Sequence, residues 1–313
     1  MAKTEHEIRD PIHGFIRFSS HERSLLNARP FQRLRHIHQL AMTYLVYPGA
    51  THKRFEHSLG VMELATRAFD EIVAEQHIVP GILDRLPEIA DRAYHSYWRQ
   101  ILRLAALCHD IGHLPFSHAA ESLLPEGKKH EFLTKLLIES DEMTALWKGF
   151  QINPRPEDIV KLALGPKEYP EGKFSDWEVI LSEIITGDAL GTDRMDYLLR
   201  DAYHTGVTYG RFDHFRLLQG LRVVLKPSED GSEMSPSLGI EEGALAGAES
   251  LLVARQFMYT QVYHHHVRLA YNLHLEDFLR EWLPDGKFDM TAEGHLALTD
   301  NEVLAAMAKS LRE

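Results

Sequence analysis

Cysteine, long apolar runs and positive charge are all scarce in this chain. A single cysteine, Cys108, occurs in 313 residues, so no intrachain disulfide can form, and this favours a reducing compartment. No apolar run approaches the length that spans a bilayer, and no signal peptide precedes the polar segment 1–10. We therefore expect a cytoplasmic protein with no membrane partner.

Positive charge is outweighed by negative charge. Lys and Arg number 34 against 46 Asp and Glu, which gives a formal net charge of −12. Because general nucleic-acid binding usually requires a basic surface, this balance argues against nucleic acid as a partner. A local group of arginines can still hold a small polyanion. Hydrophobic residues make up 44% of the chain, enough for a substantial core.

Helical periodicity dominates the sequence. Leu59, Met62, Ala65 and Phe69 recur at helical spacing, which predicts an amphipathic helix over 56–76. Other helices are expected over 21–27 with Ser20 as N-cap, and over 30–39, 98–110, 117–124, 129–139, 157–163, 177–186, 192–203, 243–263 and 266–283.

Two segments depart from this pattern. Residues 8–18 are typical of an extended segment with a turn at His13–Gly14. Residues 221–243 hold two strand-like runs around a polar, turn-rich stretch, which predicts a small β-hairpin. We therefore expect an all-α helical bundle with a small β-hairpin insertion. Its core would span 1–283, followed by a short C-terminal extension over 284–313.

The His109–Asp110 pair is the most informative local feature. It follows a segment, 98–107, that is apolar on nearly every face, as in a helix buried on all sides, and Gly112 is expected to close that helix. Burying an imidazole and a carboxylate together is unfavourable by several kcal/mol unless each is paired or bound to a cation. A metal ion is a direct solution.

Two further residues complete a candidate ligand set. His57 lies in the first turn of its helix and Asp193 near the start of another, so three helices would supply two imidazoles and two carboxylates to one site. Taken alone, each has an ordinary structural explanation, because a His-Asp pair occurs by chance and Asp193 suits an N-cap. The combination is far more specific than any member.

The order His57, His109–Asp110, Asp193 resembles the H…HD…D signature of HD-domain phosphohydrolases. Four flanking segments resemble the deoxynucleoside triphosphate (dNTP) triphosphohydrolase branch of that superfamily: residues 32–35, 47–52, 54–61 and 109–113. The resemblance covers roughly residues 7–283. It implies that the four residues of the signature hold a divalent cation (Mn, Mg, Fe, Zn, Co or Ni, which the residues do not distinguish).

The same resemblance implies roles for other residues. His118 would be the catalytic histidine, oriented by Glu121 one turn later, while His113 and His130 would line the phosphate region. The implied substrate-binding residues are Gln39, Arg54, Arg194, Tyr197, Asp201, Arg255 and Tyr263. In this set the arginines would contact phosphates, and the glutamine and aspartate would bind the sugar 3′-hydroxyl. The tyrosines would pack on the deoxyribose and crowd a 2′-hydroxyl.

The implied reaction is hydrolysis of a dNTP to deoxynucleoside and triphosphate. Metal-activated water would attack the α-phosphorus, and His118 would protonate the leaving 5′-oxygen. Three alternatives stay open: an HD phosphohydrolase of a monophosphate or signalling nucleotide, a catalytically silent nucleotide-binding regulator, and a nuclease, which the net charge disfavours. Arg194 and Arg255 have the ordinary alternative of surface ion pairs, and Tyr263 that of a helix face.

The positions aligned with the activator-nucleotide site of vertebrate relatives differ here. Asn27 replaces an aspartate, His266 replaces a lysine, and the segment 6–9 is changed, whereas Arg35 is retained. An amide cannot present two acceptor oxygens to a guanine edge, and a neutral histidine is a weaker phosphate partner than lysine. We therefore expect no strict requirement for GTP. From the resemblance alone we expect a homo-oligomer.

Overall fold

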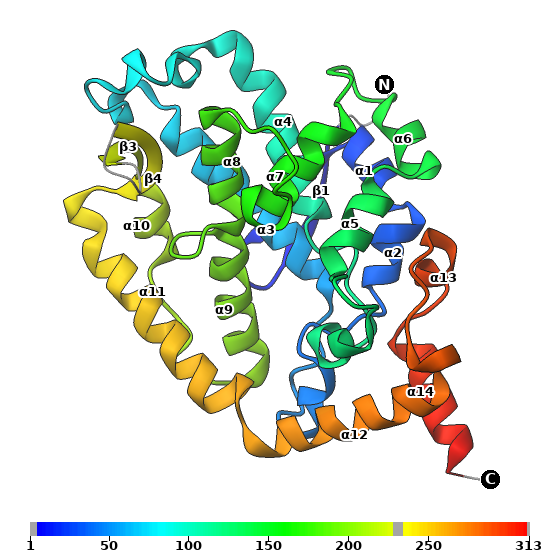
Figure 1. Cartoon of the computed structure of the whole chain (residues 1–313). Helices are drawn as coiled ribbons and strands as arrows, with labels where there is room; N and C mark the ends of the chain where they lie inside the picture. The colour runs from blue at the N-terminus through cyan, green and yellow to red at the C-terminus, as the bar shows by residue number, and fades with distance from the viewer. Residues whose placement is uncertain (1–4, 228–233, 312–313) are drawn as a thin grey trace.

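The structure is a computed structural model that describes residues 5–227 and 234–311. Helices make up most of it, and the strands form two separate antiparallel pairs (Figure 1). The expected all-α fold with a small hairpin insertion is confirmed. The turn expected inside that insertion falls at 228–233, outside the described residues. Among those residues, no helix is long and apolar enough to cross a membrane.

The elements follow one another along the chain with short connections. The longer helices are α3 (Arg54–Ile72), α4 (Arg92–Cys108), α5 (His130–Ile138), α7 (Pro156–Glu168), α8 (Asp176–Thr186), α9 (Thr192–Thr205), α11 (Leu245–Met258), α12 (His266–Trp282) and α14 (Asp300–Ser310). The shorter helices are α1 (Ser20–Leu26), α2 (Arg29–Leu34), α6 (Asp141–Trp147), α10 (His214–Gln219) and α13 (Ala292–Leu296). The strands are β1 (Glu5–Asp10), β2 (Gly14–Ser19), β3 (Leu221–Pro227) and β4 (Met234–Ile240). The 3-10 segments are Ala41–Leu45, Glu75–His77, Ile82–Asp84, Pro87–Ala90, Ser117–Leu123, Glu242–Ala244 and Pro284–Gly286, and a π turn spans Tyr259–Tyr263.

The core forms around α3 and α4. Helix α3 packs against α4, α8 and α9, and α4 also packs against α7. Every residue from Ile101 to Cys108 is buried, as the apolar sequence of that segment predicts. This arrangement brings the first turns of α3 and α9 to the C-terminal end of α4. Helix α13 packs against α2 and α5. Together with α14 it lies on the opposite side of the molecule from α11 (Figure 1).

The N-terminal segment is more ordered than expected. The predicted extended stretch with a turn is a hairpin in which Ile8 pairs with Ile16, and the turn ends at Gly14 with φ +77°. The following helix begins one residue earlier than predicted, because Ser19 rather than Ser20 is its N-cap and forms a capping box with Glu22.

Three helix predictions differ from the structure for tertiary reasons. Helix α2 ends at Leu34 rather than at Gln39, because the chain leaves the helix to pair with the segment before α3: the amide of Gln39 donates to the carbonyl of His52 (3.1 Å). The helix expected at 117–124 is a 3-10 segment. The helix expected over 243–263 turns into the π turn after Met258.

Gly112 plays a different part from the helix-closing role predicted for it. Helix α4 ends at Cys108, and Gly112 has no positive φ. Instead, a Cβ atom there would lie 2.3 Å from the backbone nitrogen of Thr134 and 2.4 Å from the carbonyl oxygen of His130. A glycine is therefore required because the His109–His113 loop packs directly on the start of α5.

Candidate metal centre and catalytic cavity

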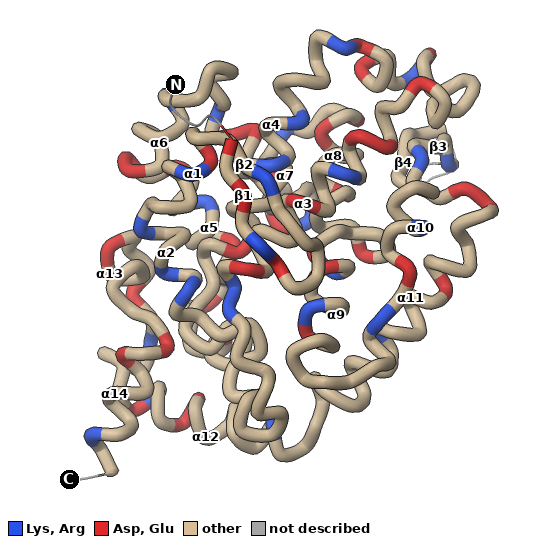
Figure 2. Tube along the Cα trace, turned by 180° about the vertical axis from the view of Figure 1, so that it is seen from behind, with Lys and Arg blue, Asp and Glu red and all other residues tan. Residues whose placement is uncertain are grey.

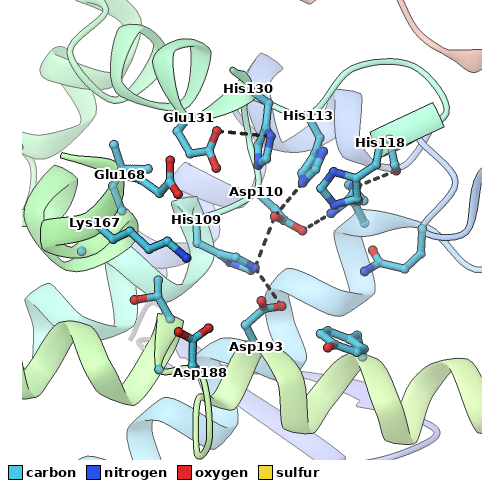
Figure 3. A pocket seen from close by; sticks show the side chains of 18 of the residues that line it. His109, Asp110, His113, His118, His130, Glu131, Lys167, Glu168, Asp188 and Asp193 are labelled. Carbon is cyan, nitrogen blue, oxygen red and sulfur yellow. Dashed lines mark hydrogen bonds and ion pairs between the residues drawn. The ribbon is translucent and has the colours of Figure 1, made fainter. Parts of the chain in front are cut away.

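Four side chains meet at the end of α4. His57 comes from the first turn of α3, His109 and Asp110 from the residues that follow α4, and Asp193 from the first turn of α9. The Nε2 atom of His57 lies 3.1 Å from an Asp193 oxygen and 3.5 Å from an Asp110 oxygen. The Nε2 atom of His109 lies 3.6 Å and 3.5 Å from the same two carboxylates. The structure thus brings the four predicted ligands together. Figure 3 shows three of them, His109, Asp110 and Asp193.

The two histidines expose lone pairs to this cluster. The Nδ1 atom of His57 is bonded to a carboxylate oxygen of Asp196 (2.7 Å), and that of His109 to the carbonyl oxygen of Ala106 (2.7 Å). Each Nδ1 therefore carries the proton, which leaves Nε2 as an acceptor. Both Nε2 atoms are buried and in no hydrogen bond. Two unbonded imidazole nitrogens facing two carboxylates are the donor set of a divalent transition-metal cation.

The electrostatics at this point favour positive charge. Burial lowers the pKa of His57, but the carboxylates of Asp193 and Asp196 together with the charge of Asp110 outweigh it and raise the pKa to about 10. The carboxylates around His57 thus favour positive charge at this point, and a divalent cation would supply it.

A buried network holds His57 from behind. Asp196 is fully buried and also binds Nε2 of His13 (2.6 Å) and two guanidinium nitrogens of Arg200 (2.8 and 2.9 Å). Arg200 in turn contacts Asp10 (2.7 Å). A Cβ atom on Gly60 would lie 1.9 Å from Asp196 Oδ1, so only glycine leaves room for this carboxylate. Carboxylate support of this kind fixes the orientation of a ligating imidazole.

This network has only a weak sequence signal. Asp196 follows Asp193 by one turn and precedes Arg200 by four residues, which places all three along one side of α9. Asp10 and His13 belong to the N-terminal hairpin, far away in sequence, and nothing local marks them.

Four predicted catalytic residues form a second group beside the cluster. Glu121 accepts a hydrogen bond from Nδ1 of His130 (2.6 Å) and another from Nδ1 of His118 (3.1 Å). The rings of His113 and His130 stack at 3.8 Å, and Nε2 of His113 lies 3.1 Å from Asp110. Burial and the positive charge of Arg54 lower the pKa of His113 well below its usual value. His118 is the most exposed of the group, with 64% of its side chain accessible.

Arg54 connects the metal cluster to the adjoining turn. Its side chain is buried, pairs with Asp110 and donates from Nε to the hydroxyl of Ser117 (2.8 Å). Phe116 and Ser117 both have positive φ, 55° and 56°, a conformation that is unfavourable by roughly 1–2 kcal/mol for residues with a side chain. This strained turn leads directly into His118.

A cavity of about 1050 Å³ opens over the cluster. Gln39, Tyr197, Asp201 and Tyr263 line one part of it. The hydroxyl of Tyr263 donates to Asp201 (2.7 Å), and the second oxygen of Asp201 is bonded to Nε2 of His52 (2.7 Å). The side-chain oxygen of Gln39 is buried without a partner. This part of the cavity therefore holds polar groups that are available to a ligand.

Two predicted phosphate contacts are not among the cavity-lining residues. Arg194 points toward Asp188, with 3.8 Å between nitrogen and oxygen, and the guanidinium of Arg255 lies 5.0 Å from the ring centre of Tyr259. The cations that line the cavity, besides Arg54, are Lys167, Lys226 and Arg268. No sequence pattern singled these out. Figure 3 shows Lys167 and Asp188 across the cluster from His118.

Charge elsewhere on the trace is mixed. From behind, separate stretches of Lys and Arg and of Asp and Glu are scattered over a largely uncharged trace (Figure 2). This pattern fits the net charge of −12 and differs from the basic stripe of a nucleic-acid binder.

Comparison with known protein families agrees with the order of the ligands. The family model of the HD domain matches residues 54–201, and that of the HD associated region matches residues 212–313. The first match includes all four residues of the candidate metal cluster.

Relatives in archaea, bacteria and animals share much of this chain. An uncharacterized protein of Methanocaldococcus jannaschii, MJ1154, is 37% identical over 84% of this chain and 47% of its own length. YwfO of Bacillus subtilis, also uncharacterized, is 36% identical over 84% of this chain and 52% of its own. The deoxynucleoside triphosphate triphosphohydrolase SAMHD1 of Bos taurus is 36% identical over 69% of this chain and 38% of its own. The chain thus spans about half the length of the first two relatives.

A solved structure shares the fold. The crystal structure of a hypothetical protein from Aquifex aeolicus superposes with a TM-score of 0.77 at 35% identity. It covers 97% of this chain, and this chain covers 72% of it. The similarity therefore extends into both family regions.

Proposed function

The chain belongs to the HD-domain phosphohydrolase superfamily, and on that premise we propose that it hydrolyses dNTPs to deoxynucleoside and inorganic triphosphate. The observation that carries the proposal is the pairing of two features at one place. Two unbonded imidazole nitrogens face two carboxylates. The cavity above them is also lined by polar side chains that could bind a sugar, those of Gln39, Asp201 and Tyr263. The cavity volume of about 1050 Å³ accommodates a nucleoside triphosphate.

The proposed ligands of the divalent cation are His57, His109, Asp110 and Asp193. When bound, such a cation lowers the pKa of a coordinated water and neutralises phosphate charge. Arg54 lies against Asp110 and is buried, so it would contact the phosphate that meets the cluster. Its fixed position supplies positive charge without reorganisation during the reaction.

His118 is the proposed general acid. Because its Nδ1 is held by Glu121 at 3.1 Å, its Nε2 is the atom left to protonate the leaving 5′-oxygen. His113 is poorly suited to this role, since burial and Arg54 lower its pKa well below the usual value. It would instead stay neutral, with Nε2 held at Asp110 (3.1 Å) and its ring stacked on His130 beside the phosphate region.

The other end of the cavity would select the sugar. Burial and the charge of Asp201 raise the pKa of Tyr263 well above its usual value, so its hydroxyl stays protonated and bonded to Asp201. Gln39 and Asp201 would bind the 3′-hydroxyl. A ribose 2′-hydroxyl would meet the rings of Tyr197 and Tyr263, whose centres are 6.2 Å apart, and an unpaired hydroxyl there is unfavourable.

One observation favours a second candidate, an HD phosphohydrolase of a monophosphate or signalling nucleotide. Arg194 and Arg255 do not line the cavity, which leaves fewer cations than expected for a triphosphate. Lys167, Lys226 and Arg268 would have to supply that charge.

A substrate panel separates these candidates. Metal-loaded protein is incubated with dNTPs, NTPs, nucleoside monophosphates and single-stranded DNA, and products are resolved by anion-exchange chromatography. The proposal predicts deoxynucleoside and intact triphosphate from dNTPs only. Release of orthophosphate from monophosphates would favour the second candidate, and no turnover of any substrate would favour a silent nucleotide-binding regulator.

We further propose a cytoplasmic homo-oligomer that needs no nucleotide activator. Arg35, the retained activator position, already stacks over the ring of Phe55 at 3.5 Å and bonds Gln32. Asn27 and His266 would weaken the same site. A single dNTP should therefore be hydrolysed without added GTP. Rates are measured with and without GTP, and light scattering measures the assembly. An enzyme inert on every single dNTP until GTP is added would refute this.

A further inference from the structure

A carboxylate from the C-terminal helix is buried beside the catalytic cavity. Asp300, the first residue of α14, has no accessible surface. One oxygen accepts the backbone amide of Phe116 (2.7 Å), and the other accepts the backbone amide (2.7 Å) and Nδ1 (2.6 Å) of His38. Lys53 donates to Nε2 of His38 (2.8 Å), so the proton of that imidazole lies on Nδ1 and points at Asp300.

These bonds do not serve to begin the helix. The N-cap of α14 is Thr299, whose hydroxyl accepts the amide of Asn301 (3.2 Å), and Glu302 closes a capping box onto the Thr299 amide (2.7 Å). All three hydrogen bonds of the Asp300 carboxylate described above leave its own helix. The carboxylate therefore joins three segments that are distant in sequence.

The segments of Phe116 and His38, which Asp300 joins to α14, meet again at Ser117. The hydroxyl of Ser117 donates to the carbonyl of His38 (2.7 Å) and accepts from Nε of Arg54 (2.8 Å). Phe116 and Ser117 both have positive φ, so the turn needs external bonds to persist. Asp300 supplies one on the Phe116 side and two on the His38 side.

We propose that Asp300 is a positioning residue for the active site. It fixes the 116–117 turn and His38, which together hold the Ser117 hydroxyl against Arg54 and set the start of the segment that carries His118. The C-terminal residues 284–313 would then be needed for catalysis through this one buried carboxylate. The catalytic part of the inference rests on the function proposed above, whereas the structural part does not.

The test compares two isosteric variants in the same helix turn. Asp300→Asn removes one acceptor, because an amide cannot accept from both Phe116 and His38. Glu302→Gln weakens only the capping box. For Asp300→Asn, kcat should fall about 10²-fold, the usual effect of a small displacement of catalytic groups, with metal content unchanged. Glu302→Gln should stay within about twofold of wild type.

A coupling measurement identifies the route. If Asp300 acts through Ser117, the Asp300→Asn change should have a much smaller effect on kcat in a Ser117→Ala background than in wild type. If the two substitutions lower kcat by fully additive amounts of activation free energy, Asp300 does not act through Ser117. Where Asp300→Asn does not fold, Asp300→Glu, which keeps the charge but is one methylene longer, is measured in its place with the same expectation.

Amide hydrogen exchange separates this inference from the proposed function. The peptide that covers 113–124 should lose protection in Asp300→Asn and keep it in Glu302→Gln. Equal exchange and equal kcat in the two variants would overturn the inference. A wild-type protein that hydrolyses no dNTP would refute the proposed function, and the exchange comparison would still decide the positioning role.

Discussion

Replacing Asp196 by asparagine tests the support of the metal cluster without touching a ligand. Asp196 is fully buried and accepts from His57, His13 and twice from Arg200. Asparagine keeps the shape but removes the charge and turns one acceptor into a donor. Since four donors converge on this carboxylate, the NH₂ group of asparagine must face one of them.

Two effects follow in different measurements. Loss of a carboxylate behind a ligating histidine lowers metal affinity about 10–100-fold, which corresponds to about 1.4–2.7 kcal/mol. Separately, Arg200 loses its main partner and keeps only Asp10. Removing one partner of a buried ion pair destabilises a fold by about 3–5 kcal/mol. Because Arg200 keeps its pair with Asp10, we expect a loss of about 3 kcal/mol.

The assay measures Mn²⁺ affinity by calorimetry and unfolding by urea, with Asp158→Asn as matched control. Asp158 is also fully buried and paired with an arginine, Arg155, but it does not line the cavity. Both variants should lose stability, whereas only Asp196→Asn should lose metal affinity. Equal metal affinities in wild type and Asp196→Asn would refute the idea that this network orients His57.

Three shorter predictions address other parts of the structure. His118→Ala should keep its metal content, but its kcat should fall about 10²–10⁴-fold, and the kcat of Glu121→Ala should fall less. Unchanged turnover in His118→Ala would show that another residue is the general acid. Wild type should prefer dATP to ATP and Tyr263→Ala should narrow that preference, so equal rates on both nucleotides in wild type would contradict the sugar assignment. For Glu22, burial raises the pKa, but the buried ion pair with Arg103 (2.7 Å) outweighs it and lowers the pKa overall. The ionised carboxylate therefore stabilises the fold at pH values above its usual pKa, and this stabilisation is lost as the pH falls toward the depressed pKa. In urea unfolding, Glu22→Gln should lose less free energy of unfolding than wild type between pH 5 and about 3.

The general architecture can be predicted because local patterns carry it. The apolar run before His109 identifies a buried helix, and the spacing of signature residues places each candidate ligand at a helix end. Helix boundaries that depend on distant partners could not be predicted. Helix α2 stops at Leu34 because Gln39 pairs with the segment before α3, a contact with no local signal.

The surroundings of the candidate site were harder to predict than its ligands. Asp196 resembles any polar residue of an amphipathic helix until His13 and Arg200 are seen to converge on it. Arg268 and Lys167 reach the cavity from segments without a motif. Asp300 reads as an ordinary acidic residue in the first turn of a helix, and only its burial shows that its partners lie elsewhere.

Metal content tests the central claim most directly. Freshly purified wild type and Asp110→Ala are measured by inductively coupled plasma mass spectrometry, with circular dichroism to verify that helices persist. A stoichiometric divalent cation in wild type, lost in Asp110→Ala with the helical signal retained, is the predicted result, because the variant removes one of two carboxylates facing the unbonded nitrogens of His57 and His109. Full metal content in Asp110→Ala, or a wild type that binds no divalent cation when one is supplied, would contradict the account.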